Sequence, residues 1–165
     1  MSAPQPREVV VGFDFGKSSH AALSRAIALA GRAPWHVLHI VCVIDPHFPF
    51  RAVPAERVGP GYADRVQEAI WELLAEEIVR NDVRTPLHFF IHARIGKPVD
   101  EILSVARDVG ADLIMVGTHG LTGIERVMIG SVSERIAREA GCTVEIVREK
   151  TYPYVPLLEV TGIAS

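Results

Sequence analysis

The segment DLIMVGTHGLTGIERVMIGSVSERIAREAG, residues 112–141, contains the pattern that decides the fold. Its start, residues 112–117, is a short apolar run typical of a buried strand, and its end, residues 131–141, has apolar residues at helical spacing. Between them lies a connection, residues 117–131, with four glycines. A strand that continues into a helix in this way is typical of α/β proteins.

The same alternation extends outward from this segment over most of the chain. Further apolar runs predict strands, and apolar residues at intervals of three and four predict helices. The expected strands are 8–14, 36–44, 86–95, 112–117 and 143–148, and the expected helices are 17–32, 66–78, 98–109 and 131–141. This order predicts an α/β fold: a single doubly wound domain, with a five-stranded, mostly parallel sheet and helices on both faces.

Local signals predict where these helices begin and end. Ser18 or Ser19 can cap the first helix, and Gly31 can end it. Pro98 suits the first position of the third helix, and Gly110 lies just past its end. We therefore expect conventional helix ends at these sites.

Composition and charge limit the classes of protein to which this chain can belong. With 165 residues, 48% of them hydrophobic, the chain suits one compact domain. A net charge of −3 without a Lys/Arg cluster argues against a nucleic-acid partner. The first residues lack the apolar core of a signal peptide, and no apolar run reaches the ~18 residues of a membrane span, so we expect a cytoplasmic protein. Cys42 and Cys142 lack metal-ligand spacing and are expected to be small buried hydrophobes.

The glycine-rich connection lies where doubly wound sheets bind ligands, between the carboxyl end of a strand and the amino end of a helix. Backbone N–H groups at a helix N-terminus favour an anion, and glycine lets the backbone approach it closely. A polyphosphate fits these requirements. Ser131 has a second interpretation, because Ser131 and Glu134 form the S-x-x-E pattern of a capping box.

Three other motifs are excluded by their spacing. The chain has no G-x-x-x-x-G-K-[ST] sequence and therefore no Walker A loop. After the first strand, Gly12 and Gly16 do not form the G-x-G-x-x-G of dinucleotide-binding proteins. No G-x-S-x-G nucleophile elbow is present either.

Gly117, Gly120, Gly130 and Ser131 reproduce the spacing G-x2-G-x9-G-[ST], which resembles the nucleotide-binding signature of the universal stress protein family in its ATP-binding branch. The start VVVGFDF, the VIDP after the second strand and the run ADLIMVGTHG are also similar to that family. The resemblance implies an adenine nucleotide alpha hydrolase-like fold. It covers residues 7–148 as one domain and leaves 149–165 as a C-terminal apolar tail.

The resemblance also implies a set of nucleotide-binding residues. Asp14 would contact adenosine and Val43 would line the adenine pocket, although an Asp before a helix can serve only as a turn or capping residue. The glycines and His119 would approach ribose and phosphates with backbone N–H groups, and two serine hydroxyls would donate to the ligand. The full set is Asp14, Val43, Gly117, His119, Gly120, Gly130, Ser131, Val132 and Ser133. The expected ligand is ATP, or ADP or AMP, with Mg²⁺ held mainly by phosphates and water, and no catalytic residue is assigned.

The expected function is that of a nucleotide-responsive stress or regulatory homodimer. A slow ATP hydrolase, with only His119 and Asp14 as candidate bases, and a dimeric interaction module without nucleotide remain alternatives. The family's dimer implies pairing through the fifth strand, where Glu145 would oppose its own copy unless a neighbour such as Arg148 compensates. The apolar residues of the tail predict that it packs across the partner subunit, as part of this interface, or across the body of its own domain, with a disordered end as the alternative. The Pro- and Gly-rich stretch 45–62 predicts a loop of undetermined role.

Overall fold

The computed structural model describes residues 7–119 and 129–153. Gly120 and the tail from residue 154 onward, which carry predictions made above, lie outside the described residues. The strands are β1 (Arg7–Phe13), β2 (His36–Ile44), β3 (His88–Ile95), β4 (Leu113–Gly117) and β5 (Thr143–Val147). The helices are α1 (Lys17–Arg32), α2 (Tyr62–Arg80), α3 (Pro98–Val109) and α4 (Ser131–Glu139).

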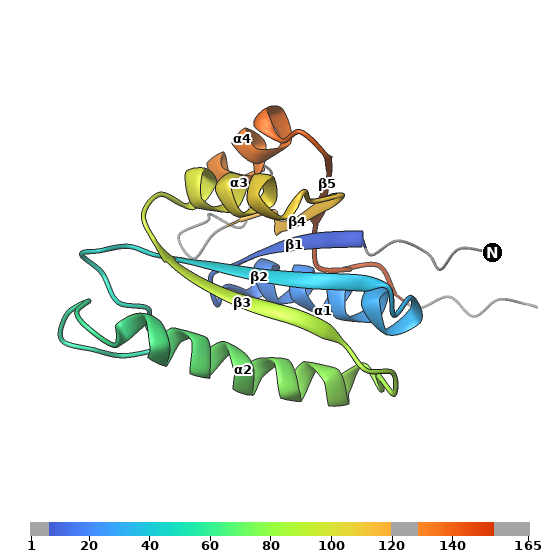
Figure 1. Cartoon of the computed structure of the whole chain (residues 1–165), viewed down its shortest axis with the longest axis horizontal. Helices are drawn as coiled ribbons and strands as arrows, with labels where there is room; N and C mark the ends of the chain where they lie inside the picture. The colour runs from blue at the N-terminus through green and yellow to red at the C-terminus, as the bar shows by residue number, and fades with distance from the viewer. Residues whose placement is uncertain (1–6, 120–128, 154–165) are drawn as a thin grey trace, which may run out of the picture.

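The five strands form one sheet in the order β3-β2-β1-β4-β5, and every neighbouring pair is parallel. Helices α1 and α2 lie against one face, and α3 and α4 lie against the other (Figure 1). The predicted doubly wound α/β architecture is thereby confirmed. The strand order reverses between β1 and β4, so the carboxyl ends of these two strands flank the switch point of the sheet.

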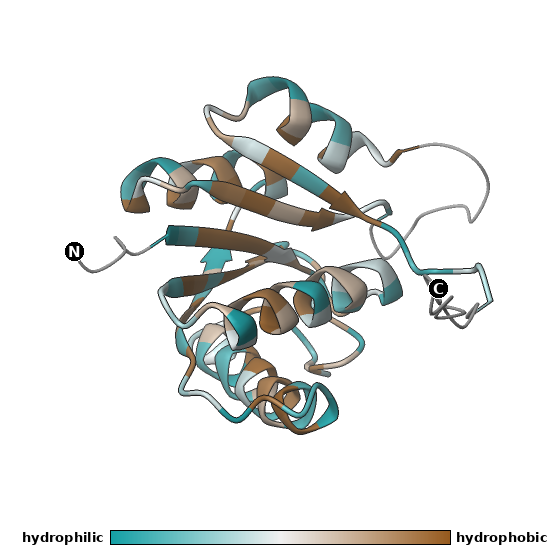
Figure 2. Cartoon of the chain, turned by 90° about the vertical axis from the view of Figure 1, so that its right-hand side faces the viewer, coloured by the Kyte–Doolittle hydropathy of each residue, from teal (hydrophilic) through white to brown (hydrophobic). Residues whose placement is uncertain are grey.

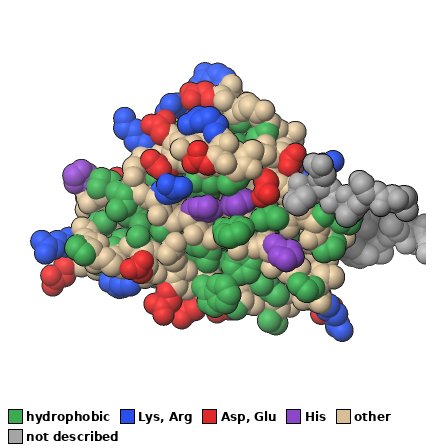
Figure 3. Space-filling view, viewed as in Figure 1, with side chains coloured by type: hydrophobic (Ala, Val, Ile, Leu, Met, Phe, Trp, Pro, Cys, Tyr) green, Lys and Arg blue, Asp and Glu red, His purple; other side chains and the backbone are tan. Residues whose placement is uncertain are grey.

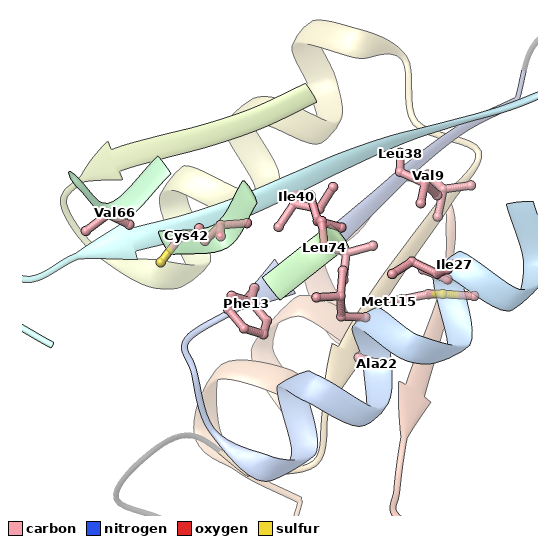
Figure 4. Packing of buried hydrophobic residues seen from close by; sticks show 14 of the residues in the cluster. Val9, Phe13, Ala22, Ile27, Leu38, Ile40, Cys42, Val66, Leu74 and Met115 are labelled. Atoms are coloured by element: carbon pink, nitrogen blue, oxygen red, sulfur yellow. The ribbon is translucent and has the colours of Figure 1, made fainter. Parts of the chain in front are cut away.

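The central strands are buried on both faces, which explains their continuous apolar sequences. In β1, Val9 and Val11 pack toward α1 and α2, whereas Val10 packs toward α3 and α4. Figure 4 shows the first of these two clusters, in which Ile27 from α1 and Leu74 from α2 meet the sheet. Figure 2 shows the sheet strands as mostly hydrophobic, with hydrophilic residues on the outer sides of the helices.

The predicted ends of α3 and the predicted range 17–32 of α1 are confirmed, but the residues predicted to cap and to end α1 are wrong. Pro98 is the first residue of α3, and Gly110 follows it with a φ of 65°. Helix α1 instead begins after Gly16, has no side-chain hydrogen bond at its cap, and continues through Gly31 to Arg32. The serines after Gly16 do not cap α1 because both hydroxyls bind other parts of the site, described below.

Residues 45–61 contain no helix or strand, as predicted for this loop. The loop is nevertheless fixed to the body of the domain. The Tyr62 hydroxyl accepts a hydrogen bond from the Phe50 N–H (2.7 Å) and donates one to the Val53 carbonyl (2.9 Å). The Phe50 ring lies 5.2 Å from the ring of Phe15, in the turn after β1. The loop therefore packs beside the carboxyl end of β1.

Both cysteines are free thiols, Cys42 fully buried and Cys142 partly buried. Burial raises the pKa of each thiol, most strongly for Cys42. The predicted role as buried hydrophobes therefore holds for Cys42 and only partly for Cys142. In the described part of the chain, no helix combines the length and apolar character required to cross a bilayer.

Candidate functional site

A cavity of about 240 Å³ opens at the switch point of the sheet. It is bounded by the carboxyl ends of β1, β2 and β4 and by the amino ends of α3 and α4. The residues that line it are Gly12, Phe13, Asp14, Ser19, Val41, Val43, Pro98, Ile102, Val116, Gly117, His119, Val132 and Ser133. Six of the residues predicted from the sequence are in this set: Asp14, Val43, Gly117, His119, Val132 and Ser133.

The carboxylate of Asp14 holds the turn between β1 and α1. Its Oδ1 accepts hydrogen bonds from the Gly16 N–H (2.9 Å) and from the Ser19 hydroxyl (2.7 Å). These contacts are those of the turn residue considered as an alternative above. Asp14 also lines the cavity, so its role in the turn leaves it positioned beside a ligand.

Phe15 occupies the left-handed region of backbone space, with a φ of 64°. This conformation is uncommon for a residue other than glycine and costs energy, which surrounding contacts must offset. The Phe15 ring lies 5.0 Å from that of Phe13 and 5.2 Å from that of Phe50. Aromatic packing therefore holds a strained turn directly next to Asp14.

Gly117, the last residue of β4, is required for packing. A Cβ at this position would lie 2.5 Å from both the backbone carbonyl carbon and the Oγ of Ser18, in the first turn of α1. Only glycine permits this close approach of helix to strand. The Gly117 carbonyl accepts a hydrogen bond from the buried Ser133 hydroxyl (2.6 Å), which links β4 to α4. The proton of Ser133 is thus used within the protein and is not donated into the cavity.

The amino end of α4 differs from the capping box suggested by the sequence. Gly130 occupies the N-cap position with an extended backbone, Ser131 is the first helical residue, and no side chain of residues 7–119 or 129–153 caps the helix. The capping-box interpretation is therefore wrong, because Ser131 lies one position too late to cap. The first intrahelical bond joins the Glu134 N–H to the Gly130 carbonyl (2.9 Å). The three preceding N–H groups and the positive end of the helix dipole are available to an anion.

Hydrogen bonds join the two ends of the predicted signature, residues 117–131. The Gly130 N–H donates to the Thr118 carbonyl (2.6 Å). Ser18 Oγ accepts from the His119 N–H (3.2 Å) and donates to the His119 carbonyl. These contacts fix the end of β4, α1 and α4 relative to one another. Gly130 and Ser131 lie beside the cavity without lining it.

His119 presents an unpartnered polar atom. Its Nε2 is buried and has no hydrogen-bond partner among the described residues. A buried polar group left in this state costs about 1–3 kcal/mol. Because His119 lines the cavity, a polar atom of a ligand placed there would supply the missing partner.

The rest of the cavity combines apolar walls with two helix N-termini. Val41, Val43, Ile102 and Val116 form apolar surface suited to a flat, weakly polar group. The amino ends of α3 and α4 contribute Pro98 and Val132. Within residues 7–119 and 129–153, no group of three or more His, Cys, Asp or Glu side chains is arranged to hold a metal ion.

Sequence reasoning missed the two serines that follow Gly16. Ser18 fixes the backbone of His119, and Ser19 fixes the carboxylate of Asp14. The dipeptide was visible in the sequence but was interpreted as a helix cap. Ser18 bonds to His119, which is 101 residues away, and a contact at that separation cannot be read from the sequence. Ser19 bonds to Asp14, which is only five residues away, so this contact could have been predicted.

A parallel α/β sheet with a cavity at its switch point is the arrangement in which doubly wound domains bind ligands. The chain belongs to the universal stress protein family, whose sequence profile matches residues 6–148. A universal stress protein of Staphylococcus epidermidis is 34% identical over 152 residues, covering 89% of this chain and 87% of the relative.

Solved structures agree with this assignment. A crystal structure described as a universal stress protein in complex with cAMP has a TM-score of 0.59 and 28% identity, and the match covers 87% of this chain and 98% of the other. The Archaeoglobus fulgidus universal stress protein in complex with dAMP has a TM-score of 0.57 and 18% identity, covering 88% of this chain and 98% of that one. The second likeness concerns the fold alone.

Proposed function

We propose that this chain binds an adenine nucleotide, with ATP as the ligand, and acts as a nucleotide-responsive regulatory homodimer of the stress response in the cytoplasm. The observation that carries the proposal is the Nε2 of His119, buried and without a partner among the described residues, in a cavity beside a helix N-terminus that none of their side chains caps. The cAMP complex of a relative adds support, because cAMP is itself an adenine nucleotide.

The residues present fit the parts of this ligand. Val41 and Val43 offer apolar contact to adenine, and Asp14 offers a carboxylate to adenosine. The N–H groups at the start of α4 and the Ser131 hydroxyl suit phosphate oxygens. Mg²⁺ would be held mainly by phosphates and water, as is common for this ion.

ATP is expected to stabilise the fold. A ligand that binds only the native state, at ~100 times its dissociation constant, adds about 2.7 kcal/mol to the free energy of unfolding. The measurement is a thermal melt of nucleotide-free protein with ATP and with GTP, in which GTP should give the smaller shift. Calorimetric titration of stripped protein without any heat of adenine-nucleotide binding would remove the proposal.

Ser131→Ala separates a role in binding from a role in helix stability. Because Ser131 does not cap α4 and is exposed, the free energy of unfolding should change by less than ~0.5 kcal/mol. Loss of a hydrogen bond to a charged phosphate costs about 1.5–3 kcal/mol, so affinity for ATP should fall roughly tenfold or more. Urea unfolding and calorimetry measure the two quantities, and the opposite pattern would return Ser131 to a structural role.

Native mass spectrometry of the purified protein distinguishes the proposal from its alternatives. A co-purifying adenine nucleotide supports binding, and the number of phosphates it retains bears on slow hydrolysis. Protein that is empty and remains so with added ATP would favour an interaction module without nucleotide. The experiment needs no assumption about which residue acts as a base.

The proposed dimer through β5 gains support from the surroundings of Glu145. Its carboxylate pairs with Arg25 of α1 (2.7 Å), on the side of the sheet that α1 covers. The sequence had suggested Arg148 as the residue that compensates the charge of Glu145, but in the structure Arg25 pairs with it. A charge compensated within its own chain is less repelled by its copy across a two-fold axis.

A further inference from the structure

Among the described residues, strand β3 is an open edge of the sheet. It is eight residues long and lies at the end of the strand order, opposite β5. The Gly96 N–H donates to the Ile44 carbonyl of β2 (3.2 Å), so even-numbered residues of β3 direct their backbone groups inward and odd-numbered ones outward. One outward carbonyl, that of Ile91, accepts from the Gln67 side chain (3.0 Å). The remaining outward groups form a template for another strand.

Exposed apolar side chains gather around this edge. Of eight large hydrophobic residues exposed in the described chain, four belong to β3 and the helix beneath it: Trp71, Val79, Phe90 and Ile95. Gln67 and Trp71, four residues apart on α2, both contact β3: the Gln67 amide bonds to the Ile91 carbonyl, and the Trp71 ring lies 5.3 Å from that of Phe89. Figure 3 shows hydrophobic side chains and histidines side by side on the face that carries this edge. Apolar surface of this kind marks an interaction site.

In the part of the chain that the structure describes, the face of β3 opposite α2 is also largely exposed. Helix α3 packs on β1 and β2, and β3 instead packs on α2. This face carries His88, Phe90, His92 and Arg94, in alternation along the strand. His92 Nε2 contacts His39 Nδ1 (3.0 Å), and His39 Nε2 contacts Glu8 Oε2 (2.7 Å), so the histidine rings are held in place.

We propose that β3 pairs antiparallel with β3 of a second copy of this chain, about a two-fold axis at His92, to form a continuous sheet across both subunits. This interface is separate from the one proposed at β5, which lies at the other edge. Antiparallel pairing about a two-fold axis makes the same surface its own complement. The odd-numbered residues, whose backbone groups point outward, then form the hydrogen bonds between subunits.

The register about His92 gives each exposed side chain a suitable neighbour. Phe90 lies opposite the partner subunit's Arg94, a pairing that favours cation–π contact. On the α2 side, Phe89 lies opposite the partner subunit's Ile95 and rests on Trp71, whose ring is 5.3 Å away. Burial lowers the pKa of His92, reinforced by His39 and Arg94, so the two axial rings are neutral at pH 7 and do not repel.

Neighbouring registers are less favourable. An axis at Ile91 places His88 opposite the partner subunit's Arg94, and an axis at Ala93 places His92 opposite it. Each moves Phe90 away from that guanidinium. Moving the two-fold axis by one residue in either direction therefore loses the contact between Phe90 and Arg94 and brings basic side chains together on one face. In the favoured register, the Ile91 carbonyl also accepts a hydrogen bond from the partner strand. The Gln67 amide then either shares this carbonyl or gives up its own hydrogen bond to it.

Cysteine cross-linking of the full chain tests the register. In a Cys142→Ser background, His92→Cys places two thiols in a non-hydrogen-bonded antiparallel pair, about 4.5 Å apart at Cα, within reach of a disulfide. We expect rapid formation of a covalent dimer under mild oxidation at low protein concentration. The matched control is His88→Cys, whose two copies would lie about 26 Å apart in this register and should not cross-link.

Sedimentation provides a second test that leaves His92 intact. Phe90→Lys faces the partner subunit's Arg94 and should remove the β3 interface, which lowers the mass of the assembly. Phe48→Lys, the same change at another exposed phenylalanine, should leave the mass unchanged. Equal cross-linking of both cysteine variants, no cross-linking of either, or an unchanged mass for Phe90→Lys would overturn the proposal. An assembly held only by β5 would show no cross-linking of either cysteine variant and an unchanged mass for Phe90→Lys. Nucleotide binding is expected to be unaffected in every variant.

Discussion

Gly130→Val is expected to abolish nucleotide binding while the fold survives. Gly130 has φ −63° and ψ 152°, a conformation that any residue can adopt. A Cβ there would lie 3.0 Å from the Thr118 carbonyl oxygen, a tight contact that a small shift can accommodate. The added methyl groups would stand at the N-cap of α4, where phosphate oxygens are proposed to meet the N–H groups. We expect the dissociation constant for ATP, measured by calorimetry, to rise at least a hundredfold, about 2.7 kcal/mol.

The matched control for this change is Gly141→Val. Gly141 lies between α4 and β5, and a Cβ there would meet no atom within 4 Å. This variant should bind ATP as the wild type does. Circular dichroism should show that both variants are folded. If Gly130→Val binds ATP normally, the N-terminus of α4 is not the phosphate site, and the proposed placement of the ligand is wrong.

Gly117→Ala is expected to have the largest effect on stability. Its Cβ would lie 2.5 Å from the Ser18 carbonyl carbon and 2.7 Å from the Ser18 carbonyl oxygen, and backbone atoms in a helix cannot rotate aside. Overpacking of this kind costs about 1–3 kcal/mol and occasionally more. Urea unfolding should show this loss, and ATP affinity should fall with it, because α1 must move away from the cavity.

Gly59→Ala is the control for backbone effects. No atom lies within 4 Å of a Cβ at Gly59, so the free energy of unfolding should change by no more than ~0.5 kcal/mol. If Gly117→Ala were equally mild, the close packing of α1 on β4 would not be the reason for glycine at this position.

The order of elements was predictable because the central strands are buried on both faces. Val9, Val10 and Val11 show this directly, since consecutive apolar residues pack into opposite clusters. Helix α3 was also predictable, because Pro98 and Gly110 act locally at its ends. The capping residue of α1 was not, because Ser18 bonds to His119, far away in sequence. The local preference of serine for a helix cap was overridden by this tertiary contact.

The cavity was predictable in location, and the contacts of the residues around it were less so. The glycine spacing indicated the end of β4 and the start of α4, and the cavity lies there. The spacing could not show that Gly117 is needed for contact with Ser18, or that the Ser133 hydroxyl bonds to the Gly117 carbonyl. Both depend on how α1 and α4 approach the sheet. The spacing of a motif shows which residues are present, but it does not show which contacts in the fold make each of them necessary.

The contact between Phe15 and Phe50 ties the strained turn beside Asp14 to the loop 45–61. A molecule that displaces Phe50 thereby alters the support of that turn, and with it the position of the Asp14 carboxylate. Thermodynamic linkage makes such an effect reciprocal: whatever factor a loop-bound molecule applies to ligand affinity, the ligand applies to the binding of that molecule. The outer surface of the loop is thus a place where a bound molecule that displaced Phe50 would change ligand affinity in the cavity.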